Sequence, residues 1–262
     1  MCLILFACNV HPSYRLVLAA NRDEFYDRPS KAADFWKKNP QVLAGVDLKE
    51  KGTWMGVTKR GKFAAITNYR DPASWKVQAP SRGQLVSRYL MGSASAEKYL
   101  NRIKVEAHQY NGFNLLLGDA ENLLIYSNRG GAQKIPDGIH GLSNHLLDTP
   151  WPKVQRGVRL LEEALSRKGE DLESALFSLL TDRLVASDDQ LPDTGIGREW
   201  ERVLAPLFIV SPGYGTRSST LLLIGKNGRI KLVEKIYHGS PESWLTSRFS
   251  FIREKQKEGR TI

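Results

Sequence analysis

The second residue of this chain is a cysteine, a residue type that can act as a nucleophile. Cys2 directly follows the initiator methionine and precedes an apolar run from Leu3 to Ala7. Because cysteine is small, we expect Met1 to be removed, which would leave a thiol and a free α-amine on one residue. An α-amine has a pKa of about 8 and a free thiol a pKa of about 8.5. The amine of Cys2 can therefore accept the proton of its own thiol, and no separate histidine is needed as a base. The sequence favours Cys2 as a nucleophile that carries its own base. The alternative is a buried strand that only happens to begin with cysteine.

A block of charged residues follows the second apolar segment of the chain. Residues 15–21 are followed by Arg22, Asp23 and Glu24. If this segment forms a strand that pairs with the one beginning at Cys2, its end lies close to Cys2. A carboxylate of Asp23 facing the amine would orient it, and Arg22 facing the thiol would lower the thiol pKa. Side chains alternate between the two faces of a strand, so Arg22 and Asp23 serve together only if the strand ends or bulges there.

Three more polar residues occupy positions suited to the same chemistry. Asn68 ends an apolar segment, and Asn144 follows another. A side-chain amide at a strand end can donate to a developing oxyanion, although asparagine is also a common turn residue. Arg217 enters a very apolar segment, and a buried arginine needs a partner. We therefore expect Arg217 to neutralise a carboxylate such as Asp23 or to bind an anionic substrate.

These residues lie near the ends of predicted strands. Apolar runs, alternation and turn signals predict strands in three groups, with a pair of helices after each of the first two groups. The predicted strands are 2–8, 15–21, 53–58, 63–69, 113–118, 123–128, 139–143, 207–211, 217–224 and 229–237. The predicted helices are 82–91, 95–107, one that starts at 151–152, and 171–181, with a short helix near 244–249 in a polar, basic tail.

Strands in groups, separated by paired helices, favour an α+β protein with antiparallel sheets and helices outside them. Two such sheets stacked face to face would form a four-layer α/β/β/α sandwich, and one large mixed sheet is the alternative. We find no linker, so we expect a single domain over residues 1–262 with a basic tail from about 240.

Composition limits the class of protein. The 262 residues carry a net charge of +10, which favours anionic ligands and allows peripheral contact with an anionic membrane, while no nucleic-acid, zinc or phosphate-loop motif is present. No apolar run reaches the ~18 residues of a spanning helix. Cys2 and Cys8 on one strand would lie roughly 20 Å apart, too far for a disulfide, which favours a reducing, cytoplasmic setting.

Several motifs along the chain carry a family resemblance. The chain resembles the NRDE family, the transport and Golgi organisation type-two proteins, over nearly its whole length. The resemblance implies an N-terminal nucleophile fold and a wider likeness to penicillin V acylases, bile salt hydrolases and acid ceramidase-like enzymes. The motifs that carry it are Met1-Cys2-Leu3, Ala20-Asn21-Arg22-Asp23-Glu24 with Arg28-Pro29, Gly52-Thr53-Trp54-Met55-Gly56, Thr67-Asn68, Gly141-Leu142-Ser143-Asn144 and Tyr214-Gly215-Thr216-Arg217-Ser218-Ser219-Thr220.

The wider resemblance also implies roles for single residues. Cys2 corresponds to the nucleophile, and Arg22 and Asp23 take the places of an arginine and an aspartate that are two residues apart in the acylases but adjacent here. Asn68 and Asn144 resemble the asparagines that bind the oxyanion and position the amine, and Arg217 resembles a late arginine. These assignments predict a cysteine hydrolase that cleaves an amide or thioester of an unknown small molecule and needs no cofactor.

The family resemblance also points to haem trafficking and lipid-related cell biology, which gives a second hypothesis. A non-catalytic carrier would hold haem or another amphipathic anion in the same cleft, with His140 and His145 as candidate haem ligands. No Cys-x-x-Cys-His motif is present, so any haem would be bound without a covalent link. Trp54, Trp75 and Trp151 lie near predicted strand ends and are candidates to line an apolar pocket.

Overall fold

The computed structural model describes residues 2–119 and 121–254, and within them two seven-stranded antiparallel sheets. The first sheet has the order β10-β1-β2-β12-β13-β14, with the short β11 paired to β12. Its strands are β1 (Cys2–Cys8), β2 (Tyr14–Phe25), β10 (Gly138–Leu142), β11 (Val210–Ser211), β12 (Tyr214–Gly225), β13 (Arg229–Tyr237) and β14 (Trp244–Ile252).

The second sheet runs in chain order from β3 to β9, so that each strand pairs with the next one. Its strands are β3 (Ser30–Trp36), β4 (Asn39–Asp47), β5 (Met55–Thr58), β6 (Phe63–Asn68), β7 (Phe113–Gly118), β8 (Leu123–Ser127) and β9 (Gly131–Lys134). The α-helices are α1 (Gly83–Met91), α2 (Ala96–Glu106), α3 (Pro152–Leu165), α4 (Gly169–Leu180) and α5 (Arg198–Val203).

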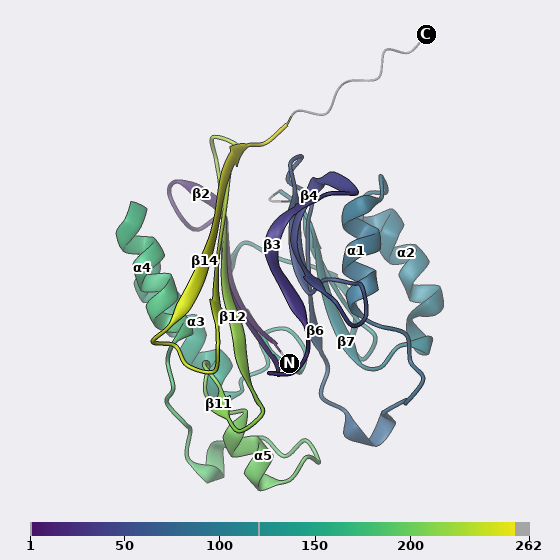
Figure 1. Cartoon of the computed structure of the whole chain (residues 1–262), viewed down its shortest axis with the longest axis vertical. Coiled ribbons are helices and arrows are strands. Elements are labelled where there is room, and N and C mark those ends of the chain that lie inside the picture. Colours follow the sequence, from purple (N-terminus) through teal and green to yellow (C-terminus); the bar gives the residue numbers. More distant parts are fainter. Residues whose placement is uncertain (1, 120, 255–262) are drawn as a thin grey trace.

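The sheets and helices form the four-layer α/β/β/α sandwich that the sequence predicts. The two sheets face each other, with α3 and α4 on the outside of the first and α1 and α2 on the outside of the second (Figure 1). Cys2, the first described residue, lies at the start of β1 and lines the same cavity as Ile66 and Asn68 of β6 in the second sheet. The first strand is therefore placed where its initial residue meets both sheets.

Alternation along β1 shows how the layers are held together. Ile4 and Phe6 belong to the core between the two sheets, whereas Leu3 and Leu5 pack with α3 and α4. All four side chains are almost fully buried, and burying each of them contributes roughly 1.5–3 kcal/mol. A strand buried on both faces explains why residues 2–8 read as a continuous apolar run.

Two glycines of the segment 52–56 are required by close packing. A Cβ on Gly52 would lie 2.6 Å from the carbonyl carbon of Gly83 at the start of α1. A Cβ on Gly56 would lie 2.6 Å from the Cβ of Ala44 and 2.8 Å from Leu90 of α1. The segment therefore fixes α1 against the second sheet, and residue 83 lines the candidate site described below.

The sequence-based prediction is wrong at the end of the chain. Residues 244–252 form strand β14 and not a short helix, because Phe249 and Phe251 pack on the core while Arg248 and Ser250 alternate with them. This spacing of two is typical of a half-buried strand. The basic tail expected from about 240 therefore includes an edge strand, and its last eight residues lie outside the described ones.

Four other elements, β3, β4, β9 and α5, were not predicted from the sequence. The predicted strand 207–211 is also shorter, since only Val210 and Ser211 are paired. Strand β3 carries polar residues at Lys31 and Asp34 and its pairing with β4 is irregular, which weakens its alternation.

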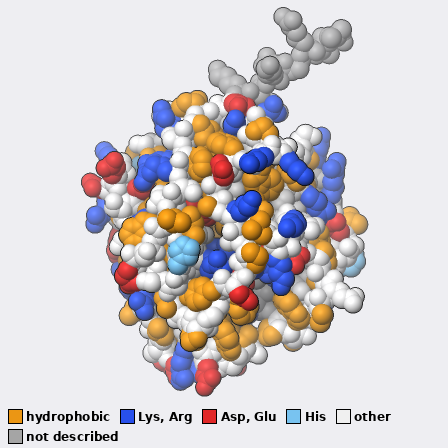
Figure 2. Space-filling model, in the orientation of Figure 1, with side chains coloured by type: hydrophobic (Ala, Val, Ile, Leu, Met, Phe, Trp, Pro, Cys, Tyr) orange, Lys and Arg blue, Asp and Glu red, His pale blue; other side chains and the backbone are white. Residues whose placement is uncertain are grey.

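Basic side chains are spread over the face seen in Figure 2, as expected for a net charge of +10. No helix among the described residues is long and apolar enough to cross a membrane.

Candidate functional site

A cavity of about 380 Å³ lies where β1 begins and where β2 and β6 end. Cys2, Arg22, Asp23 and Asn68 all line it, although they come from three separate strands. The wall also includes Trp54 and the segment 75–83, while other parts of the lining come from residues 47–50. The cavity brings together four of the six residues that the sequence predicts for catalysis.

Cys2 and Arg22 face each other across the β1–β2 pair. Their Cα atoms are partners in the strand register, so both side chains point into the space between the sheets. The guanidinium carbon of Arg22 lies 4.3 Å from the centre of the Trp54 ring, a cation–π contact that fixes it beside the thiol. Burial raises the pKa of the Cys2 thiol, and the charge of Arg22 and a hydrogen bond from the Asp23 backbone oppose this rise.

Asp23 points to the opposite face of β2 from Arg22, as the alternation predicts. Its Oδ1 accepts a hydrogen bond of 2.7 Å from the Thr216 hydroxyl, and the residue is buried. Burial raises the pKa of this carboxyl, while the charges of Lys153 and Arg22 lower it. Asp23 still lines the cavity because the cavity lies at the end of the sheet.

A β-bulge accompanies this arrangement on the neighbouring strand. Thr216 pairs with Asp23 and Ser218 pairs with Arg22, so Arg217 is an extra residue in β12. The bulge that the sequence analysis required is therefore in the partner strand and not in β2, which continues to Phe25.

Asn68 and Asn144 are in contact but differ in position. Asn68 ends β6 and lines the cavity, and its side-chain amide forms no hydrogen bond with any other described residue. Asn144 is fully buried behind it, and its Nδ2 donates to the Asn68 backbone carbonyl over 3.0 Å. The structure therefore corrects the prediction that both asparagines face the reacting group. Asn68 can donate into the cavity, whereas Asn144 positions Asn68.

Arg217 is also placed differently from the prediction. Its Nη1 donates to the backbone carbonyls of Phe25 and Arg28, over 2.8 and 3.0 Å. It is not part of the cavity wall and forms no ion pair with Asp23 among the described residues. Its side chain holds the turn after β2, because a residue outside the regular pairing is free to point there.

The two histidines proposed as haem ligands do not line the cavity. Both ring nitrogens of His140 are within hydrogen-bond distance of protein oxygens, Nδ1 2.8 Å from Asp148 and Nε2 3.1 Å from the Pro136 carbonyl. His145 lies between the rings of Tyr69 and Trp151, and its Nδ1 contacts the Thr149 hydroxyl. The geometry therefore does not favour a haem site in this cavity with His140 and His145 as ligands. Across the described ranges no group of three or more His, Cys, Asp or Glu is arranged to hold a metal ion.

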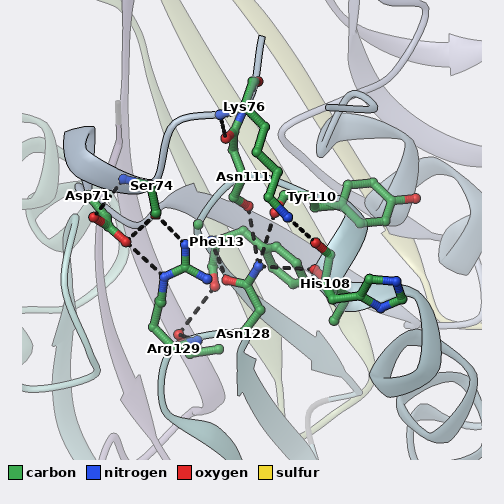
Figure 3. Close-up of polar contacts among 12 residues, drawn as sticks. Asp71, Ser74, Lys76, His108, Tyr110, Asn111, Phe113, Asn128 and Arg129 are labelled. Atoms are coloured by element: carbon green, nitrogen blue, oxygen red, sulfur yellow. Dashed lines mark hydrogen bonds and ion pairs between the residues drawn. The ribbon is translucent and has the colours of Figure 1, made fainter. Parts of the chain in front are cut away.

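Part of the segment 69–82 lines the cavity, and hydrogen bonds anchor its first part at residues 71, 74 and 76 (Figure 3). The backbone of Lys76 exchanges two hydrogen bonds with the side chain of Asn111, over 2.7 and 2.9 Å. Arg129 donates to Asp71 and Ser74 over 3.0 and 2.5 Å. The segment therefore has a defined conformation.

The three tryptophans predicted to line an apolar pocket lie at two different pockets. Trp54 and Trp75 line the cavity beside Cys2, whereas Trp151 lines a smaller neighbouring pocket. Trp75 is carried by the anchored segment, which presents its ring to the cavity. The three tryptophans therefore do not share one pocket, and the cavity that Trp54 and Trp75 line also contains many charged residues.

Sequence reasoning missed two cations of this region. Arg82 precedes α1 and lines the cavity, and burial lowers its pKa to about 10. Lys153 is only 5% exposed, its Nζ donates to the Leu204 carbonyl over 2.9 Å, and burial lowers its pKa to about 8 while Asp23 opposes this change. The available signal for Lys153 was its helical spacing with Gly157 and Leu161 on the buried face of α3. No pattern in the sequence around Arg82 indicates that it lies in the cavity wall.

Comparison with known proteins gives a consistent family assignment. A family model described as Transport and Golgi organisation 2 (TANGO2) matches residues 1–239. The Transport and Golgi organization protein 2 homolog of Bos taurus is 41% identical over 273 residues, which cover 96% of this chain and 99% of that protein. The homolog of Homo sapiens is 39% identical, with the same two coverages.

Two solved structures are similar at much lower identity. The N-acylethanolamine-hydrolyzing acid amidase ortholog of Caenorhabditis elegans has a TM-score of 0.48 at 11% identity and covers 84% of this chain and 92% of its own. A mutant of the conjugated bile acid hydrolase from Clostridium perfringens has a TM-score of 0.45 at 10% identity over the full length of both chains. The family assignment rests on the family model and the sequence relatives: the chain belongs to the Transport and Golgi organisation 2 family.

Proposed function

We propose that the chain is a cysteine hydrolase of the N-terminal nucleophile type, which cleaves an amide or thioester of a small molecule. The observation that carries the proposal is the shared cavity of Cys2, Arg22, Asp23 and Asn68. A thiol, a cation, a carboxylate and an amide donor from three strands meet there. These are the groups that acyl transfer through a thioester requires.

In the proposed first step, the Cys2 sulfur attacks the carbonyl carbon of the substrate. The thiol proton passes to the α-amine of Cys2. This amine is free only if Met1 has been removed and Cys2 is the first residue of the mature chain. Burial raises the pKa of the thiol, so the attack needs a base that accepts the proton, and the α-amine serves as that base. Arg22 favours the thiolate, and the Asn68 amide stabilises the tetrahedral oxyanion.

In the second step, the carbon–nitrogen or carbon–sulfur bond of the substrate breaks. The leaving amine or thiol takes the proton from the Cys2 ammonium, and an S-acyl cysteine remains. Water then attacks the thioester with the amine as base, which releases a carboxylic acid and restores the thiol. Asp23 orients the amine in both steps, and Lys153 supports Asp23 as a carboxylate.

The experiment is intact-mass spectrometry before and after treatment with an activated ester such as p-nitrophenyl acetate. We expect a chain without Met1 that gains one acyl group, which hydroxylamine removes, and we expect Cys8→Ser but not Cys2→Ala to retain this behaviour. Active protein that keeps Met1 would overturn the mechanism, because the amine would then be part of a peptide bond. Acylation that persists in Cys2→Ala would also overturn the mechanism, because the acyl group would then be on another residue.

Haem binding and a cytoplasmic location stay predictions. A haem carrier would show a Soret band when haemin is added, and this band would survive Cys2→Ala. Its absence with micromolar haemin would remove the carrier hypothesis.

A further inference from the structure

The cavity beside Cys2 is rich in charge, and most of these charges have partners. Arg28 contacts Asp47 through both Nε and Nη2, over 2.8 and 2.7 Å, and lies 3.7 Å from Glu24. Arg22 stacks on Trp54. The charged residues of the wall are Arg22, Arg28, Lys49 and Arg82 with Asp23, Glu24, Asp47 and Glu50.

Arg82 differs from the other arginines of the wall. Its Nη1 donates one hydrogen bond of 2.9 Å to the Gly112 carbonyl, and in the described part of the chain it forms no ion pair. A guanidinium carries five N–H donors, so most of them remain available. The side chain stays charged at neutral pH, since its pKa falls only to about 10. The charge of Glu24 acts on Arg82, but no carboxylate of the described residues forms an ion pair with it. Such a half-buried cation in the wall of a cavity is suited to binding an anionic oxygen group.

Apolar side chains lie next to Arg82 on the same wall. Trp75 is 61% exposed and Val77 is 90% exposed, and both line the cavity. The guanidinium of Arg82 lies 5.8 Å from the centre of the Trp75 ring. Their chain neighbours Ser74 and Lys76 are held by hydrogen bonds to Arg129 and Asn111 (Figure 3). A ligand that covers them would therefore be apolar in one part and anionic in another.

We propose that Arg82 is a specificity-determining residue that binds the carboxylate or phosphate of an amphipathic substrate whose apolar part packs on Trp75 and Val77. The proposal rests on the proposed function in one respect, namely that the reacting carbonyl of this substrate lies at Cys2. The binding of the anion itself does not depend on any reaction.

The first test compares two alkylating reagents of nearly equal size, iodoacetate and iodoacetamide, on a Cys8→Ser background. We expect Arg82→Gln to lower the ratio of their rates at Cys2 by roughly fivefold or more, because the local positive potential attracts only the anion. Arg82→Lys retains most of the ratio, and added salt reduces it. Arg102→Gln, the same change on an exposed face of α2, leaves it unaltered. An unchanged ratio in a folded Arg82→Gln protein overturns the proposal.

The second test does not depend on the reactivity of Cys2. Isothermal titration calorimetry on Cys2→Ala compares octanoate, octyl phosphate and octanamide. We expect one or both anions, but not the amide, to bind, and we expect Arg82→Gln to weaken the anion at least roughly fivefold. The two anions distinguish a carboxylate from a phosphate ligand. Equal binding of octanamide, or anion binding that survives Arg82→Gln, overturns the proposal. An unreactive Cys2 with Arg82-dependent octanoate binding would instead count against the hydrolase alone.

Discussion

Strand β1 begins and ends with a cysteine, and the two thiols have different neighbours. At one end, Arg22 and the backbone of Asp23 oppose the effect of burial on the pKa of Cys2. At the other end, burial and the charge of Asp137 act together and raise the pKa of Cys8 to about 12. Cys2 opens to a cavity, whereas Cys8 belongs to the core between the sheets. The two residues are of the same type, and both lie at an end of the same strand. The comparison teaches that neighbouring charges and access from the cavity, which other strands supply, decide which thiol can react.

The region behind Cys2 contains buried charges, and removing one of them should have the largest effect. The side chains of Arg70 and Glu201 are 6% and 3% exposed and lie 2.6 Å apart. We expect Arg70→Met to reduce the free energy of unfolding by about 3–5 kcal/mol, because Glu201 is left as an unpaired buried charge. Urea unfolding measures this loss.

A matched surface pair supplies the control for Arg70. Arg129 and Asp71 are both more than a quarter exposed, so Arg129→Met should cost less than about 1 kcal/mol. Equal losses in the two variants would contradict the view that buried charge underlies the Cys2 end of the strand.

The next prediction compares the two thiols directly. Burial raises the pKa of both thiols, but only Cys2 lines the cavity and has a neighbouring arginine that lowers its pKa, so iodoacetamide should label Cys2 roughly tenfold or more faster than Cys8. Peptide mapping of partially labelled protein gives the two rates. Faster labelling of Cys8 would reverse the comparison.

A smaller effect should follow from changing the charges around Cys2. Arg22 lowers the pKa of the thiol, so Arg22→Met should slow alkylation of Cys2 roughly threefold to tenfold near pH 8. The charge of Asp23 raises the same pKa, so Asp23→Asn should speed alkylation while it slows turnover of a substrate. Two variants that shift the rate in the same direction would show that packing, and not charge, controls the thiol.

The smallest effect concerns the neighbourhood of Cys8. His140 lies on β10, which pairs with β1, and its hydrogen bond to Asp148 raises its pKa. A raised pKa stabilises the fold below the unfolded value of about 6.5, and this stabilisation is lost as the pH rises through the folded value. Asp148→Asn should therefore cost less than about 1 kcal/mol at pH 5.5 and almost nothing at pH 8.5. Thermal unfolding at both pH values measures the difference, and a loss independent of pH would mean that the pair acts through geometry alone.

The sequence predicts the elements of the site better than their contacts. Strand β1 and helix α3 follow from apolar runs and helical spacing, and the proximity of Arg22 to Cys2 follows from pairing two neighbouring strands. The role of Asn144 could not be predicted, because its partner is a backbone carbonyl 76 residues away. Arg82 has no local signal, since its importance comes from the cavity and not from its neighbours in sequence. Strand β14 was misread because alternation on an edge strand is easily mistaken for a polar tail.

The bulge at Arg217 has a consequence for how this protein can change. Every paired residue of β2 near the bulge already has its partner without Arg217, so a chain shortened by this one residue would keep the ladder intact. Among the described residues, the side-chain hydrogen bonds lost would be the two from Arg217 to the carbonyls of Phe25 and Arg28. These two hydrogen bonds can therefore be gained or lost without a change in the strand pairing. The conformation of the turn can change independently of the sheet.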